Sequence, residues 1–489
     1  MPHGATRTSQ DSAARLLPLA VDLDGTLLAG DVLHEQFVKL LLRRPLLLLR
    51  LFAGLRHGKA AFKRRMVSLL PPLAVALPFR KPFLDWLREQ RQAGRSLHLV
   101  TASDQHVADA VAAHLGIFET ATGSDGATNL RGAAKGQTLR ARFPEGFVYA
   151  GDSKADLDVW SMADAAVLVN ASNATAAQVR ARGWPILAEF GRVRPGLRDW
   201  IAAIRLHQWS KNALLLVPLL LGHRFSDPHA VLRVLAAMLL LSVAASGTYI
   251  LNDLADLEAD RLHAKKWRRP FASGRLSPIA GLCVAVALIG GALVGGALLA
   301  WTCDALIAGY VAISLTYSLR LKSVPFLDTS IIAALFTLRL VLGIEMARVL
   351  YSPWLISFAG FFFLSLALAK RHVEVMQAAG DAGNASASLA RRGYLPEDWP
   401  LTLAFGVAAA FASLQIMILF VADDAGPSHL YAHPSRLYLA PSIVALWLMR
   451  VWFLAHRKRL SHDPVIFALR DPVSWFLGVC ILAIVLAAL

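Results

Sequence analysis

The sequence is poor in cysteine and lacks the pattern of a secretory leader. Its three cysteines, Cys283, Cys303 and Cys480, all lie within apolar runs. We therefore expect small buried hydrophobic side chains there, not a disulfide framework. Residues 1–20 do not follow the basic, then apolar, then small-residue order of a signal peptide. The N-terminal part of the chain is accordingly expected to stay in the cytoplasm.

Acidic residues are also scarce, with 34 Asp and Glu against 50 Lys and Arg and a net charge of +16. Such an excess can indicate a nucleic-acid partner. Much of it lies in short loops between apolar runs, where the positive-inside rule of membrane proteins explains it equally well. We expect no nucleic-acid partner.

Long apolar runs are abundant, but only in one part of the 489 residues. Residues 1–200 mix charged and apolar side chains, whereas 212–489 repeat apolar runs of about 20 residues, the length that an α-helix needs to cross a bilayer. We predict a soluble domain over 15–190, a basic entry segment over 191–211 and a polytopic membrane domain over 212–489. The nine expected spans are about 212–224, 229–251, 277–294, 296–316, 325–346, 352–369, 400–421, 438–456 and 472–489. Only the glycine-rich stretch 290–296 separates the third span from the fourth, so eight spans are the alternative.

The basic residues of the loops predict the orientation of these spans. Alternate loops, starting from a cytoplasmic N-terminus, hold sixteen Lys and Arg. These loops are 252–276, 317–324, 370–399 and 457–471. The opposite side holds four arginines, Arg224, Arg233, Arg348 and Arg436. The bias places the loops in the cytoplasm, and we expect a multi-pass protein of the plasma (inner) membrane.

Two carboxylates open the soluble domain. An apolar strand within Leu17–Leu28 leads into Asp22 and Asp24, two residues apart at the strand end. Side chains alternate along a strand, so both carboxylates are expected to point the same way. In a phosphatase the first can attack phosphorus and the second can shuttle the proton.

Three further signals follow in order along the soluble domain. Thr101 ends a predicted strand over Leu97–Val100 and offers a hydroxyl to a phosphate oxygen. Lys135 offers a cation for the same charge. Asp152 and Asp156 follow a third predicted strand and are suited to Mg²⁺.

These four signals in this order resemble the haloacid dehalogenase superfamily. The resemblance implies an α/β, Rossmann-like fold with Asp22 as nucleophile and Asp24 as acid/base, both near Mg²⁺. It further implies Thr101 and Lys135 as phosphate ligands, with Asp152 and Asp156 at the metal. Residues 31–80, rich in Leu and Arg, would form a small helical cap. A folded but inactive relative is the alternative, although no motif residue is missing.

An acidic run marks the membrane domain. In Asn252–Asp260, three aspartates, Asp253, Asp256 and Asp260, fall within about 60° of one another if the run is helical. Carboxylates on one stripe repel each other unless cations lie among them, and a divalent metal carrying a diphosphate meets that need. A solvated loop face is the alternative.

Basic and aromatic clusters accompany this run. Lys265, Lys266, Arg268 and Arg269 can bind phosphates or only fix the topology. Arg205–Asn212, with Lys211, precedes the first span and can equally serve as an interface anchor. Charged groups near hydrocarbon are functional candidates. Here they are Arg320 and Lys322 in Tyr317–Lys322, Asp328, Arg339, and Lys370 with Arg371. Asp328 and Arg339 lie about three helical turns apart, so each needs another partner.

The membrane domain resembles the UbiA-type superfamily of membrane prenyl and phosphoribosyl transferases, with Asn252–Asp260 matching its first acidic motif. The second acidic motif is incomplete, since Ile332 stands a turn after Asp328. Tyr317–Lys322, His207–Asn212 and Lys370–Glu374 resemble the branch that makes polyprenyl-phosphate phosphoribose. The resemblance implies phosphoribosyl diphosphate as donor, a polyprenyl phosphate as acceptor, Mg²⁺ at the aspartates, and phosphates held by Lys211, Arg320 or Lys322. The substrate-binding candidates are Asn252, Tyr317, Asp328, Lys370 and Arg371.

Three functions remain open from the sequence. The first is transfer of 5-phosphoribose to a polyprenyl phosphate, after which the soluble domain removes the 5-phosphate. The second is a prenyltransferase that joins a polyprenyl diphosphate to an aromatic acceptor. The third is a transporter or scaffold with a degenerate soluble domain, which leaves the acidic run unexplained.

Overall fold

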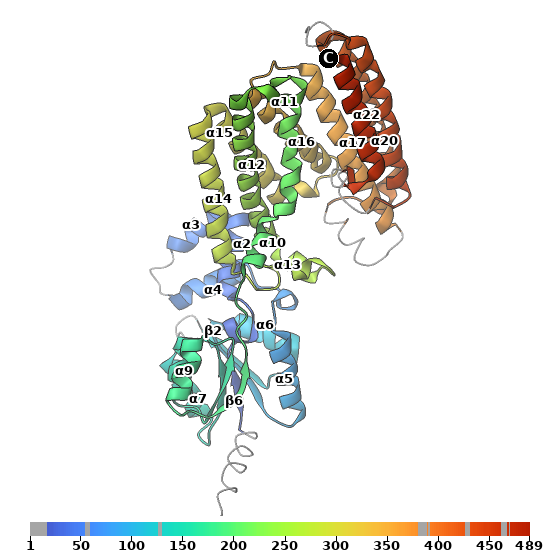
Figure 1. Ribbon diagram of the computed structural model, residues 1–489. Coiled ribbons are helices and arrows are strands. Elements are labelled where there is room, and N and C mark those ends of the chain that lie inside the picture. Colours follow the sequence, from blue (N-terminus) through green and yellow to red (C-terminus); the bar gives the residue numbers. More distant parts are fainter. Residues whose placement is uncertain are drawn as a thin grey trace, which may run out of the picture. The chain divides into compact units, whose positions relative to one another are not determined.

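The computed structural model describes residues 17–53, 59–125, 130–379, 389, 392–425, 431–460, 467–468 and 470–489. The chain divides into two compact units, coloured along the sequence in Figure 1. The N-terminal unit comprises the residues up to Ile204 together with Asp253–Cys283. The membrane unit comprises Arg205–Asn252 and Val284–Leu489. The expected domain start at residue 15 lies outside the described residues.

A six-stranded parallel sheet forms the centre of the N-terminal unit, in the order β3-β2-β1-β4-β5-β6. Its strands are β1 (Leu19–Val21), β2 (Leu97–Asp104), β3 (Thr120–Ser124), β4 (Val148–Gly151), β5 (Ala165–Val169) and β6 (Ile186–Phe190). The strands β1, β4 and β5 are fully buried, as their continuous apolar sequences require of a parallel sheet covered on both faces. The predicted α/β fold is confirmed.

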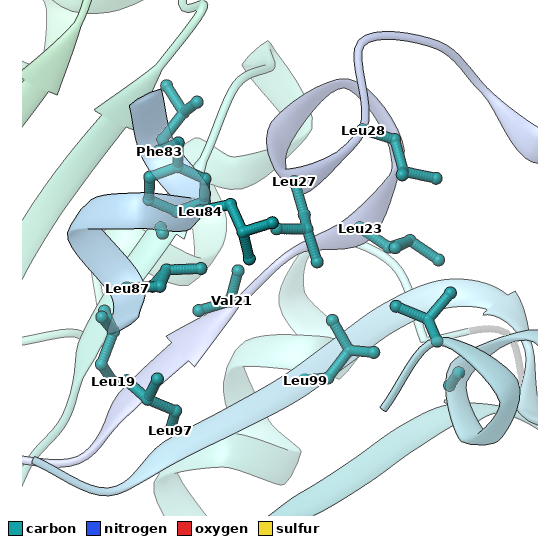
Figure 2. Close-up of a cluster of buried hydrophobic side chains, with 14 of the residues drawn as sticks. Leu19, Val21, Leu23, Leu27, Leu28, Phe83, Leu84, Leu87, Leu97 and Leu99 are labelled. Carbon is teal, nitrogen blue, oxygen red and sulfur yellow. The ribbon is translucent and has the colours of Figure 1, made fainter. Parts of the chain in front are cut away.

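Helices cover both faces of this sheet (Figure 1). They are α5 (Lys81–Gln92), α6 (Gln105–Leu115), α7 (Ala133–Arg142), η4 (Lys154–Asp156), α8 (Leu157–Trp160) and α9 (Asn173–Ala181). On one face, α5 buries Phe83, Leu84 and Leu87 against the side chains of Leu19 and Val21 (Figure 2). The spacing of the three α5 residues is that of an amphipathic helix.

A helical insertion separates the first strand from α5. After the tight turn η1 (Leu23–Leu27), its elements are α2 (Val32–Arg43), α3 (Pro45–Ala53), α4 (Lys59–Leu69) and η3 (Ala74–Ala76). Leu40, Leu48, Leu51 and Met66 form a small apolar cluster of its own. Helices between residues 31 and 80 were expected from the sequence, and they are present.

After β6, the described residues are almost entirely helical. Seven helices are long and apolar enough to cross a membrane, among the described residues. The long helices are α12 (Pro228–Ala255), α14 (Pro278–Leu299), α15 (Trp301–Leu319), α16 (Leu327–Ala347), α17 (Pro353–Ala378), α19 (Trp399–Phe420) and α20 (Ala440–His456), and the shorter α22 spans Pro472–Ala488. Short elements are α10 (Leu197–Ile204), η5 (Leu206–Leu215), α11 (Leu216–Leu221), η6 (Arg224–Ser226), α13 (Leu257–Leu262), η7 (Lys266–Arg268), η8 (Leu321–Ser323), η9 (Pro396–Asp398), η10 (Val421–Ala425) and η11 (Pro434–Leu439). The predicted polytopic helical domain is confirmed.

Two details of the expected spans are wrong. The first span is no continuous helix, because the 3₁₀ segment η5 is followed by the six-residue α11, which contains Pro218. Proline has no N–H for the helical ladder. The third and fourth spans are separate, but they break at the extended residue Ala300 and not at the glycine-rich stretch 290–296, which lies inside α14. The expected loops 370–399 and 457–471 lie partly outside the described residues.

Candidate functional site

A carboxylate and an ammonium group meet at the carboxyl edge of the sheet. Asp22 follows β1, and its N–H donates to the carbonyl of Ala150 in β4 at 3.0 Å. Lys135 Nζ, from α7, lies 2.7 Å from Asp22 Oδ1, and both residues are buried. Burial raises the pKa of Asp22, and the Lys135 ammonium opposes that rise. The contact therefore favours the ionised carboxylate that a nucleophile needs.

Three acidic side chains converge at the same edge. Oxygens of Asp22, Asp152 and Asp156 all lie within 4.8 Å of one another. Burial, followed by the charges of Asp156 and Asp22, raises the pKa of Asp152 to about 8. Crowded carboxylates need a positive charge among them, and oxygen ligands at this separation fit a hard divalent cation such as Mg²⁺.

The three aspartates differ in their remaining partners. Asp156 accepts hydrogen bonds from Tyr149 Oη at 2.8 Å, Ser153 N at 2.9 Å and Asp152 N at 3.2 Å. It therefore shapes the loop that carries Asp152. Asp152 accepts from the Thr26 hydroxyl at a long 3.4 Å. Asp22 and Asp152 are consequently better placed than Asp156 to contact a cation directly.

The carboxylate of Asp24 turns away from this trio. One oxygen accepts from the N–H of Val32 at 2.8 Å and the other from Ser103 Oγ at 2.5 Å. Burial, followed by the charge of Asp31, raises the pKa of Asp24 to about 7, which suits a proton donor and acceptor near neutral pH. The expected contact of its carboxylate with a metal finds no support in this arrangement.

Gly25 lies against the metal-site loop. Its φ is +79°, a region that favours glycine. A Cβ at this position would lie 2.4 Å from Asp152 Oδ2. The glycine that directly follows the second carboxylate of the first motif is thus required by both its backbone angle and its close neighbour.

The structure adds Ser103 and Lys63 to the residues that the sequence analysis identified. The predicted ligand Thr101 is fully buried in β2, which continues to Asp104, and its hydroxyl accepts from the N–H of Ser103. Ser103 lies two positions further on, so the alternation of a strand puts it on the same side and signals its role. Lys63 of α4 donates to the carbonyl of Ala102 at 2.7 Å, and no sequence signal singles it out among the basic residues of the insertion.

The acidic run of the sequence is not one helix. α12 ends at Ala255 and α13 begins at Leu257, with the half-buried Asp256 between them at φ −101° and ψ 10°. The predicted continuous stripe is therefore wrong at its middle residue. Asp253 and Asp260 are nevertheless buried and converge, since both accept from Arg269 Nη1, at 3.0 and 2.6 Å. Two of the three expected aspartates thus share one cation.

A buried ion pair lies within the membrane unit. Asp328 of α16 pairs with Arg371 of α17 and accepts from Tyr394 Oη at 2.8 Å. Tyr317 interacts electrostatically with both Asp328 and Arg371. Arg371 is thereby the partner that Asp328 was expected to need. Arg320 and Lys370 have exposed side chains and Lys322 a half-buried one.

A second polar cluster surrounds Arg339, which is buried in α16. Its guanidinium donates to Asn212 Oδ1 at 2.8 Å and to Tyr310 Oη at 3.1 Å. It also lies over the ring of Phe336, as does Lys211 Nζ, at 5.2 and 5.6 Å. Two cations beside one ring in a membrane domain form a place where an anion is favoured. Asn252 lies half-buried in α12.

Two protein-family models match this chain. A model of the UbiA prenyltransferase family matches residues 214–488, and a model of haloacid dehalogenase-like hydrolases matches residues 19–160. The uncharacterized protein y4nM of Sinorhizobium fredii is 45% identical over 471 residues, which are 96% of this chain and 91% of that protein.

Two further relatives match shorter parts of the chain. Nodulation protein NoeC of Azorhizobium caulinodans is 34% identical over 293 residues, which are 58% of this chain and 90% of that protein. Decaprenyl-phosphate phosphoribosyltransferase of Corynebacterium glutamicum is 34% identical over 182 residues, 36% of this chain and 54% of that protein. The chain therefore belongs to the UbiA prenyltransferase family, and it is a multi-pass membrane enzyme with a haloacid dehalogenase-like hydrolase domain at its N-terminus.

Proposed function

We propose that the membrane domain transfers 5-phosphoribose from phosphoribosyl diphosphate to a polyprenyl phosphate, and that the N-terminal domain removes the 5-phosphate from the product. The observation that carries the proposal is the pairing of two chemistries on one chain. The transfer leaves a phosphomonoester, and the buried Asp22 and Lys135 form, with the half-buried Asp152, a site suited to that class of substrate. The likeness to a decaprenyl-phosphate phosphoribosyltransferase supports the choice of donor.

The phosphatase step uses the two carboxylates of the first motif in different roles. Asp22 attacks phosphorus while Asp24 gives its proton to the departing sugar oxygen, leaving an aspartyl phosphate. Asp24 then takes a proton from the water that attacks this phosphorus, and orthophosphate leaves as Asp22 is restored. Thr101 and Lys135 hold the phosphate oxygens. Mg²⁺ on Asp22 and Asp152, with Asp156 behind them, would neutralise charge on the phosphate.

The transferase step needs its own cation site and phosphate ligands. Asp253, Asp256 and Asp260 would hold Mg²⁺, which would stabilise the diphosphate as it leaves. An oxygen of the lipid phosphate attacks the anomeric carbon, and the bond from that carbon to the diphosphate breaks. The remaining proposed ligands are Lys211, Arg320 and Lys322 for phosphates, and Asn252, Tyr317, Asp328, Lys370 and Arg371 for substrate.

Both active sites are proposed to face the cytoplasm at the plasma membrane. The sixteen basic residues of the four expected cytoplasmic loops support this orientation. Fusing the domains raises the effective concentration of the second active site near the product of the first.

The test uses purified full-length protein with both substrates. It should release diphosphate first and orthophosphate afterwards. Asp22→Asn should stop only orthophosphate release, and Asp253→Asn should stop both releases, since the second depends on the first. Orthophosphate release that survives Asp22→Asn would contradict the coupled scheme.

A prenyltransferase that joins a polyprenyl diphosphate to an aromatic acceptor is the second candidate, favoured by the family that matches residues 214–488. Exchanging the labelled donor separates the two. Incorporation of labelled ribose phosphate into lipid supports the phosphoribosyl transfer, and incorporation of the labelled prenyl chain into the aromatic compound replaces it.

A further inference from the structure

The helix α13 contacts two different parts of the N-terminal unit. Toward one side, Asp260 binds the guanidinium of Arg269. Toward another, Glu258 and Arg261 contact α2, the first helix of the insertion that follows Asp22. At about 100° per residue, Glu258 and Asp260 point in nearly opposite directions on a helix. A helix of the transferase sequence is therefore also a neighbour of the phosphatase helix α2.

The contact with α2 is regular along both segments. Lys39 Nζ lies 2.6 Å from Glu258 Oε1, and Arg43 Nη2 donates to the carbonyl of Ala255 at 2.9 Å. Together with Glu35, these α2 residues recur at every fourth position and form one stripe. Their partners recur at every third position, in the reverse order along the chain. This regular pairing of residues indicates a specific interface between α2 and the segment that contains α13.

Arg261 is the centre of this interface. Its Nη1 and Nη2 lie 2.8 and 2.6 Å from the two carboxylate oxygens of Glu35. Nη1 also donates to the carbonyl of Ala76 at 3.0 Å, and Nε to that of Ala272 at 2.9 Å. The side chains of Arg261 and Glu35 are 7% and 13% exposed. A bidentate, nearly buried pair of this kind is geometrically specific and shielded from salt.

The first turn of α2, which begins at Val32, also holds Asp24, the proposed acid/base of the phosphatase. Val32, the first residue of α2, donates its N–H to Asp24 Oδ1 at 2.8 Å. Asp31 caps this helix by accepting from His34 N at 3.1 Å. Glu35 therefore lies one helical turn from the Val32 N–H that orients Asp24. A contact that fixes the position of Glu35 therefore also fixes this first turn.

We propose that Arg261, a residue of the transferase's acidic segment, is a positioning residue for phosphomonoester hydrolysis. By clamping Glu35 it fixes the first turn of α2, and this turn fixes the Val32 N–H that orients the carboxyl of Asp24. The inference rests on the proposed phosphatase activity and adds to it a requirement outside the phosphatase sequence. A displacement of about 1 Å at a catalytic group can cost up to about 100-fold in rate.

The test compares two substrates that differ in their need for a proton donor. kcat/KM reports the first step, in which the leaving oxygen is protonated if it is an alkoxide. The departing p-nitrophenolate needs no proton. Arg261→Gln in the full-length protein should lower kcat/KM for an alkyl phosphate such as ribose 5-phosphate by about 10- to 100-fold. The value for p-nitrophenyl phosphate should change less than about threefold, because the active site itself is intact.

Two variants and a control accompany this comparison. Glu35→Gln removes the same contact from the other side and should reproduce the selective loss, and Arg261→Lys should give an intermediate loss because it keeps the charge without the fork. Arg275→Gln is the matched control. Arg275 lies on the same segment and pairs with Asp199 of α10 at 2.9 Å, and its loss should leave both substrates unaffected.

The outcomes separate this inference from the function on which it rests. If the wild-type protein hydrolyses neither substrate, the proposed phosphatase activity is wrong. If the wild type is active and both Arg261→Gln and Glu35→Gln leave the alkyl phosphate unaffected, the positioning role is wrong. Equal losses on both substrates, with a matching fall in thermal stability, would also overturn it, because they indicate a merely structural contact.

Discussion

Gly25 provides the sharpest test of the metal-site geometry. Gly25→Ala introduces a Cβ at φ +79°, where an L-residue costs about 1–2 kcal/mol. The same Cβ would lie 2.4 Å from Asp152 Oδ2 and 2.8 Å from its Cγ. Asp152 must therefore retreat by more than half an ångström, and such overpacking adds about 1–3 kcal/mol.

The matched control for this variant is Gly94→Ala. Gly94 has a φ of +87°, and a Cβ there would meet nothing within 4 Å. It reproduces the backbone strain without the collision, so the difference between the two variants isolates the displacement of Asp152. We expect Gly94→Ala to lose about 1–2 kcal/mol and keep its phosphatase activity. Gly25→Ala should lose more stability and lower kcat/KM by about 10- to 100-fold.

The assays are thermal unfolding, hydrolysis of p-nitrophenyl phosphate and a magnesium titration of activity. Because Asp152 is displaced, Gly25→Ala should need more Mg²⁺ to reach half of its activity, whereas Gly94→Ala should not. A Gly25→Ala enzyme that matches Gly94→Ala in stability, activity and magnesium requirement would refute the proposed cation site between Asp22 and Asp152.

Three other predictions follow from the two units. Because the pKa of Asp152 is raised to about 8, from about 3.9 in an unfolded chain, protonated Asp152 contributes stability that is complete below about pH 4 and is lost as the pH rises through about 8. Thermal unfolding in a metal chelator should show this decline, and Asp152→Asn should flatten it. Arg339→Gln should raise the KM of a phosphate-bearing transferase substrate by about tenfold, equivalent to 1.4 kcal/mol, with an unchanged unfolding temperature; a lower unfolding temperature with an unchanged KM would indicate a structural role. Arg371→Leu leaves Asp328 buried without its cation and should cost about 3–5 kcal/mol, of which Asp328→Asn in the same protein should restore a large part.

The sequence predicts the phosphatase-type site well for a physical reason. The motifs around Asp22, Thr101 and Asp152 lie on or directly after the strands β1, β2 and β4, and parallel strands bring their carboxyl ends to one edge of the sheet. Asp22 and Asp152 are 130 positions apart in the chain, yet the pairing of β1 with β4 places their oxygens within 4.8 Å. The order of the motifs, through the resemblance to the haloacid dehalogenase superfamily, anticipated this convergence.

Other features depend on tertiary contacts that no local pattern encodes. The break at Asp256 separates two stretches that both read as helix, so periodicity alone predicts one stripe. In η5, which has 3₁₀ geometry, Asn212 donates to Ser242 Oγ and accepts from Arg339 Nε, residues that are 30 and 127 positions away. The choice of Arg269 as the shared partner of Asp253 and Asp260, among four neighbouring basic residues, likewise required the fold.

The contact between α13 and α2 changes what the fusion of the two domains accomplishes. A flexible tether raises the effective concentration of the second active site, and it leaves each domain's own chemistry unchanged. Here the transferase sequence supplies Arg261, which clamps the helix that orients Asp24. If this clamp acts as proposed, hydrolysis of an alkyl phosphate depends on residues 253–283 as well as on the phosphatase sequence.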